Sequence, residues 1–238
     1  MFKTIKNSIP NSITSMNLLS GVVAIIMAFH FNELLWMGLK GYQWAFICIG
    51  AAALFDFCDG ASARLLHAYS SLGKELDSLA DMVSFGVAPA MLMFNAMLLT
   101  YEGSPLSYFA LFIPVMGALR LAKFNIDETQ KTTFAGLPIP ANAIFWIGFV
   151  NMLAMDGVTP MIWITMAVIA AVALMMVAKM RMFSLKFKNF SLRQNALRFL
   201  IIIAAVALVA IFGVTGLMWT IVLYIILSAG SLFRPAVD

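Results

Sequence analysis

The sequence has few charged residues: 11% of its 238 residues are Asp, Glu, Lys or Arg, against about 25% in an average soluble protein. Hydrophobic residues make up 63% of the chain, and the mean hydropathy is +0.96. A water-soluble globule cannot bury so much apolar surface, and a disordered chain needs the opposite composition, low hydrophobicity with high charge. The composition therefore excludes a soluble enzyme and a disordered protein, and it predicts a polytopic helical membrane protein.

Cysteine and histidine are also scarce. The two cysteines, Cys48 and Cys58, lie inside apolar segments, which argues against a disulfide-stabilised scaffold. The two histidines, His30 and His67, stand alone in the sequence and suggest no metal site of their own. The formal net charge of +4 is too small to indicate a nucleic-acid partner.

Long apolar runs fill most of the chain. A membrane-spanning helix needs about 20 mostly apolar residues. No small-residue cleavage site follows Lys3 and Lys6, so we do not expect a secretory signal peptide. We predict an all-α fold, a polytopic membrane helical bundle that forms one domain over residues 1–238. Its eight transmembrane helices are expected at approximately 13–31, 44–65, 77–99, 106–124, 139–155, 160–178, 196–212 and 214–232.

The positions of the basic residues predict the orientation. With eight spans, Lys40 alone of the 15 Lys and Arg residues falls on one side, together with Glu33, Glu102 and Asp156. Basic residues accumulate on the cytoplasmic side, so we expect both termini in the cytoplasm. The basic segment 179–195 then lies against anionic membrane lipids, or it serves only as a topology signal. The other 14 basic residues share the cytoplasmic side: Lys3, Lys6, Arg64, Lys74, Arg120, Lys123, Lys131, Lys179, Arg181, Lys186, Lys188, Arg193, Arg198 and Arg234.

Four aspartates interrupt the second and third predicted spans. Asp56 and Asp59 are three residues apart, and Asp77 and Asp81 are four apart, so each pair shares one helix face. A carboxylate at mid-membrane costs about 2.5–3.5 kcal/mol, and facing carboxylates repel unless cations lie between them. Hard divalent ions prefer carboxylate oxygens together with substrate phosphates. The sequence therefore predicts a site for Mg²⁺ or Mn²⁺, with two ions clamping a phosphoryl or pyrophosphate group.

The same stretch carries a recognisable pattern, D-x2-D-G-x2-A-R-x8-G-x3-D-x3-D. Its fixed positions are Asp56, Asp59, Gly60, Ala63, Arg64, Gly73, Asp77 and Asp81. This pattern resembles the signature of the CDP-alcohol phosphatidyltransferase family. The resemblance implies a membrane enzyme that binds a nucleotide lipid at two divalent metals, works at the cytoplasmic face of the cell membrane and forms a homodimer.

Further segments are similar to the members of that family whose acceptor alcohol is L-serine. These segments are 9–14, 17–21, 76–90, 118–125 and 134–140, so they fall within residues 9–140, the expected catalytic half. The helices after about residue 141 agree only in being hydrophobic. The resemblance implies that CDP-diacylglycerol and L-serine react to give phosphatidylserine and CMP. Lys123 departs from the pattern, because an arginine is common at that place. Two alternatives stay open: another acceptor, such as glycerol 3-phosphate or an inositol phosphate, and, more remotely, an ion-coupled transporter.

The resemblance also implies roles for single residues. Asn11 and Thr14 have an alternative role as helix caps after Pro10, and Arg120, Lys123 and Asn125 have one as interfacial side chains. The metal ligands would be Asp56, Asp59, Asp77 and Asp81, with Asp81 also the general base. CDP-diacylglycerol would be contacted by Asn11, Thr14, Gly60, Arg64, Ser70 and Gly73. L-serine or a phosphate would be held by Ser84, Arg120, Lys123 and Asn125.

Overall fold

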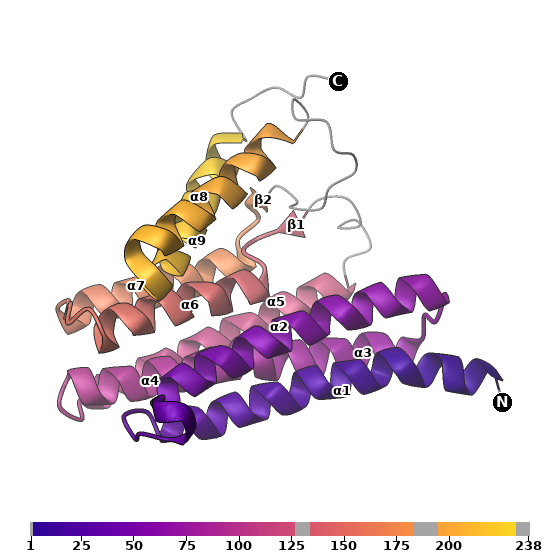
Figure 1. Ribbon diagram of the computed structural model, residues 1–238. Coiled ribbons are helices and arrows are strands. Elements are labelled where there is room, and N and C mark those ends of the chain that lie inside the picture. Colours follow the sequence, from indigo (N-terminus) through magenta and orange to yellow (C-terminus); the bar gives the residue numbers. More distant parts are fainter. Residues whose placement is uncertain (1, 127–133, 183–194, 232–238) are drawn as a thin grey trace.

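The computed structural model describes residues 2–126, 134–182 and 195–231, and these residues are almost entirely helical (Figure 1). The long helices are α1 (Phe2–Phe29), α2 (Gly41–Leu66), α3 (Ser71–Asp81), α4 (Ala88–Thr100), α5 (Phe112–Ile126), α6 (Ile139–Ala154), α7 (Ile162–Val177), α8 (Ala196–Phe212) and α9 (Gly216–Ser231). A π-helical turn, η2 (Met82–Val87), joins α3 to α4. Short 3-10 helices are η1 (Trp36–Gly38), η3 (Pro105–Leu111) and η5 (Gly213–Thr215), and the strands are β1 (Phe134–Ala135) and β2 (Arg181–Met182).

A helix lies at each of the eight predicted spans. Within the described residues, five stretches are long and apolar enough to cross a membrane: Ser8–Phe29, Gly41–Leu66, Ser71–Thr100, Pro105–Ile126 and Ala196–Ala229. Helices α6 and α7 are apolar but have only 16 residues each, fewer than the usual 20 or so. The helical membrane fold is thus confirmed, while the number of eight crossings and the cytoplasmic termini stay predictions. Of the basic residues that carried the orientation, Lys131, Lys186, Lys188, Arg193 and Arg234, and the side chains of Lys3, Lys6 and Arg181, lie outside the described part.

Helix α6 is the centre of the molecule. Eleven of its 16 residues are buried, and it contacts α4, η2, α7 and α9. In Figure 1, α1 to α7 run side by side, and the α8–α9 hairpin leaves this bundle at an angle. The antiparallel pairing of β1 with β2, with Phe134 opposite Met182, ties the start of α6 to the end of α7. In the same view, α2 and α3, which carry the aspartates, lie on the other side of α6 from the hairpin.

Several helix contacts depend on glycine. Gly21 of α1 lies against Ser84 of η2, and a Cβ at Gly21 would collide with the Oγ and Cα of Ser84. Gly148 of α6 likewise leaves room only for the backbone of Met218. Lipid tails are as apolar as the helices, so association inside a membrane relies on close packing at small residues.

We expect Gly21→Ala to destabilise the fold. The added methyl group has no space against Ser84, and overpacking of this kind lowers the free energy of unfolding by about 1–3 kcal/mol. Thermal unfolding of the purified protein in detergent should show the lower midpoint. Gly50→Ala in α2 is the matched control, because a Cβ there meets nothing within 4 Å. Equal midpoints for the two variants would contradict the assigned α1–η2 contact.

Candidate active site

A short turn between α2 and α3 brings the predicted aspartates to one end of the bundle. His67 ends α2 in the left-handed conformation with φ 50°, and its N–H bonds to the Arg64 carbonyl. Ser70 begins α3, where its Oγ accepts a hydrogen bond of 3.0 Å from the Gly73 N–H. Ser70, which the sequence predicted as a nucleotide contact, is thus the N-cap of α3.

Three carboxylates meet across this turn. Oxygens of Asp56 and Asp59, from α2, and of Asp77, from α3, all lie within 4.8 Å of one another. Asp59 is buried, and the buried Oδ1 of Asp77 has no hydrogen-bond partner in the described part of the chain. Three negative groups this close repel one another, and the unpaired oxygen lacks a cation or donor. An all-oxygen set of this kind fits Mg²⁺ or Mn²⁺.

Helix α1 packs against both α2 and α3 and presents polar side chains to the cluster. Thr14 is buried, and its Oγ1 lies 2.6 Å from Asp59 Oδ2 and 3.0 Å from the Pro10 carbonyl oxygen. A threonine hydroxyl has one proton, so we assign its donor bond to the shorter contact, with the carboxylate. One turn later, the fully buried Asn17 donates from Nδ2 to Asp81 Oδ1 over a long 3.5 Å.

The alternative prediction, that Asn11 and Thr14 are helix caps, is wrong. α1 runs without a break through Pro10, so both residues lie in the helix interior. Asn11 lies against the start of α3, where its Oδ1 is 3.0 Å from the position of a Cβ on Gly73. Asn11, Thr14 and Asn17 recur every three residues and share one face of α1. This spacing was the available signal for Asn17, which the sequence analysis did not select.

Asp81 lies beside the three-carboxylate cluster. It is close enough to Asp56, to Asp77 and to Arg120 of α5 to interact electrostatically with each. Arg120 is half-buried, and its Nε is buried without a hydrogen-bond partner in the described residues. Its guanidinium carbon lies 5.9 Å from the centre of the Phe124 ring. The site thus combines an acid that can accept a proton with a cation that has a free donor.

Unlike Arg120, the other residues predicted to hold L-serine or a phosphate are either bonded to another helix or exposed. Ser84 is fully buried, and its Oγ donates to the Asn17 carbonyl at 3.0 Å. Asn125 donates from Nδ2 to Ser78 Oγ at 2.9 Å, which ties the end of α5 to α3. Lys123 is exposed. Ser84 and Asn125 therefore use polar groups in contacts between helices.

Open space lies beside the last turns of α2. A Cβ at Gly60 would meet only Nη1 of Arg64, at 3.7 Å, and Arg64 itself is exposed. A bulky anionic group could therefore approach the backbone at Gly60 while remaining within reach of a guanidinium.

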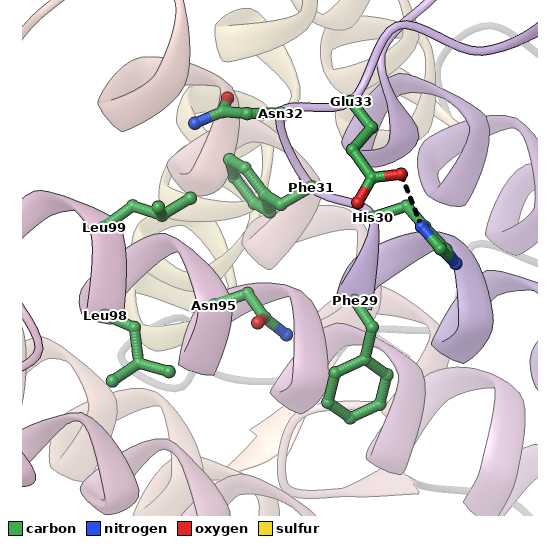
Figure 2. A pocket seen from close by; sticks show the side chains of 8 residues that line it. All are labelled: Phe29, His30, Phe31, Asn32, Glu33, Asn95, Leu98 and Leu99. Atoms are coloured by element: carbon green, nitrogen blue, oxygen red, sulfur yellow. Dashed lines mark hydrogen bonds and ion pairs between the residues drawn. The ribbon is translucent and has the colours of Figure 1, made fainter.

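A separate cavity of about 380 Å³ lies at the other end of α1 (Figure 2). Thr14 and Phe29 are 15 residues apart, which is roughly 22 Å along a helix. In the cavity His30 Nδ1 pairs with Glu33 Oε2 at 2.7 Å. None of the predicted site residues is among those that line it: Phe29, His30, Phe31, Asn32, Glu33, Asn95, Leu98 and Leu99. This cavity is therefore separate from the aspartate cluster.

Comparison with known proteins gives two consistent results. Residues 7–227 match the family model of CDP-alcohol phosphatidyltransferases. The chain is also similar to curated proteins named CDP-diacylglycerol–serine O-phosphatidyltransferase. It is 41% identical to that of Bacillus subtilis over 134 residues, 38% identical to that of Mycobacterium leprae over 152 residues, and 35% identical to that of Methanocaldococcus jannaschii over 146 residues.

These similarities cover part of each protein. They span 56%, 60% and 61% of this chain, and 70%, 47% and 62% of the three relatives in the same order. The family match is longer, because it includes most of α1, all of α2 to α8 and most of α9.

The contact between Thr14 and Asp59 predicts a change in metal affinity. Thr14→Val removes the hydroxyl that orients the buried carboxylate, and loss of such a partner weakens metal binding about 10–100-fold. Titration of the purified protein with Mn²⁺, followed by electron paramagnetic resonance, measures the affinity. Thr14→Ser keeps the hydroxyl and should retain most of the affinity. Equal Mn²⁺ binding by the valine and serine variants would show that the hydroxyl does not support the ligand.

Proposed function

Because the chain belongs to the CDP-alcohol phosphatidyltransferase family, a family of phosphotransferases, we propose that it transfers the phosphatidyl group of CDP-diacylglycerol to L-serine. The products are phosphatidylserine and CMP. The observation that carries the proposal is the cluster of Asp56, Asp59 and Asp77, with Asp81 and Arg120 beside it, at one end of apolar helices. The acceptor follows from the names of the relatives that the chain resembles.

The apolar helices suit a substrate that is itself a membrane lipid. In this proposal the acyl chains of CDP-diacylglycerol stay in the bilayer, and its nucleotide and L-serine arrive from the cytoplasm. The protein acts as a homodimer in the cytoplasmic membrane, with the site at the cytoplasmic surface.

The carboxylates would hold the divalent ions. Asp56, Asp59 and Asp77 are the proposed ligands, joined by Asp81 when two ions, Mg²⁺ or Mn²⁺, are present. Bound there, such ions would neutralise the charge of the pyrophosphate and of the leaving CMP. Thr14 orients Asp59 through its hydroxyl.

Asp81 is the proposed general base. It accepts the proton of the serine hydroxyl while the hydroxyl oxygen bonds to the β-phosphorus. The bond from that phosphorus to the oxygen of CMP breaks, and CMP leaves with the electron pair. Asn17 helps to orient Asp81 by donating from Nδ2 to Oδ1 of the carboxylate.

Arg120 is the proposed anchor for the carboxylate of L-serine. It supplies a half-buried cation next to the base, and its Nε is free to donate. Arginine suits this task because its fork of N–H groups matches a carboxylate. The CDP head group would lie along Asn11, Gly60, Arg64 and Gly73, where α1, α2 and α3 meet.

The protein should make phosphatidylserine only with its aspartates and a divalent ion. Purified protein in detergent, given CDP-diacylglycerol, Mn²⁺ and labelled L-serine, should produce labelled phosphatidylserine and CMP. EDTA should stop the reaction, and Asp81→Asn should lower kcat about 10²–10⁴-fold, the usual contribution of a general base. Glu102→Gln, which changes an exposed acid far from the site in sequence, is the control.

Two other results would redirect the assignment. CMP release only with glycerol 3-phosphate or an inositol phosphate would keep the site and exclude serine as acceptor. No CMP release with any acceptor, from protein that still binds Mn²⁺, would favour an ion-coupled transporter.

The anchor role of Arg120 predicts a selective kinetic defect. Arg120→Gln should raise the KM for L-serine about 10–100-fold, the equivalent of one charged hydrogen bond. The KM for CDP-diacylglycerol should change much less. Lys123→Gln is the comparison, and its effect should be smaller because Lys123 is exposed. A larger serine defect in the Lys123 variant would assign the carboxylate to Lys123.

A further inference from the structure

The chain widens into the π-helical turn η2 directly after Asp81. Pro89 explains the widening, because it has no N–H for the carbonyl of Phe85, four residues earlier, and its ring crowds that carbonyl. Phe85 is fully buried. A buried carbonyl without a donor is costly, and inside a membrane no water replaces the missing partner.

Asn142 of α6 supplies the missing donor. Its Nδ2 lies 3.1 Å from the Phe85 carbonyl oxygen. Its Oδ1 accepts a hydrogen bond of 2.8 Å from Trp146 Nε1, one turn further along α6. All three side chains are completely buried. The amide of Asn142 is therefore fixed at both ends, in a place that water does not reach.

The π turn is connected to the site through α5 as well as through α3. A Cβ at Gly117 of α5 would lie 3.9 Å from Gly86 Cα in η2 and 3.1 Å from Ile139 Cδ1 of α6. α5 thus crosses η2 at two glycines. Arg120 follows Gly117 by three residues and lies on the same face of α5, and it interacts electrostatically with Asp81.

We propose that Asn142 is a positioning residue for the active site. By holding the Phe85 carbonyl, it maintains the π turn η2. This turn sets the orientation of Asp81, and it also fixes where α5 crosses η2 and therefore where Arg120 lies. A π turn amounts to one residue inserted into an α-helix. Loss of the π turn would rotate α3 relative to α4 by about 100° and would shift α3 along the helix axis by about 1.5 Å. The catalytic part of this inference rests on the proposed function.

The first test is Asn142→Leu, which keeps the approximate volume and removes both hydrogen bonds. We expect kcat to fall about 10–100-fold, because a misplacement of about 1 Å has that effect on an enzyme. The KM for CDP-diacylglycerol should change less than kcat, because Asp56 and Asp59 lie on α2, which η2 does not interrupt. The midpoint of thermal unfolding should also fall.

A second variant separates positioning from stability. Pro89→Ala restores a backbone N–H, so the Phe85 carbonyl can be satisfied without Asn142. The double variant Asn142→Leu with Pro89→Ala should recover most of the decrease in the midpoint of thermal unfolding, because a regular α-helix can now form. Its kcat should stay low, because that helix lacks the π turn.

Three outcomes would overturn the inference. Unchanged kcat and midpoint in Asn142→Leu would remove any role for the amide. A double variant as unstable as the single one would contradict the assigned contact with the Phe85 carbonyl. A double variant that regains both stability and kcat would leave Asn142 with a structural role only.

A matched asparagine provides the control. Asn95 of α4 is half-buried and donates from Nδ2 to the Met91 carbonyl of its own helix at 2.9 Å, so Asn95→Leu should leave kcat unchanged. Failure of the proposed function would be separate, because it would leave the unmodified protein inactive with L-serine. The stability comparison of the Asn142 and Pro89 variants would then still test the contact.

Discussion

The aspartates within the apolar helices repel one another, and this repulsion constrains how the neighbouring helices pack. Each carboxylate in such surroundings needs a donor, a cation or both. Asp59 has the hydroxyl of Thr14, and Asp81 has the amide of Asn17 and the charge of Arg120. These partners come from α1 and α5, so the cluster on α2 and α3 determines which faces of four helices meet.

Much of this arrangement was predictable because it is local in the sequence. The spacing of Asp56 and Asp59, and of Asp77 and Asp81, follows helical periodicity, and a turn of a few residues can only return the chain to the same end of the bundle. Three of the four acids do meet. Apolar run length was enough to predict a helix at every expected span.

What the sequence could not supply depends on contacts between distant segments. The Thr14–Asp59 bond joins residues 45 apart, and nothing in either local pattern selects that partner. The predicted third span, 77–99, is divided between α3, η2 and α4. Pro89 was a visible signal for a disturbance there, but the position of the donor in α6 was not. Arg120 and Lys123 are only three residues apart, and only packing makes one half-buried and leaves the other exposed.

The bond from Asn142 to Phe85 spans 57 residues, which has a consequence for biogenesis. A chain is synthesised from its N-terminus, so α1 to α5 enter the membrane before α6 does. Every aspartate of the cluster is then already in place, while the Phe85 carbonyl still lacks its donor. Insertion of α6 supplies this donor, the amide of Asn142. The alignment of the acids with Arg120 is therefore among the last features of the site to form. The nascent chain contains the functional groups of the site before their relative positions are fixed.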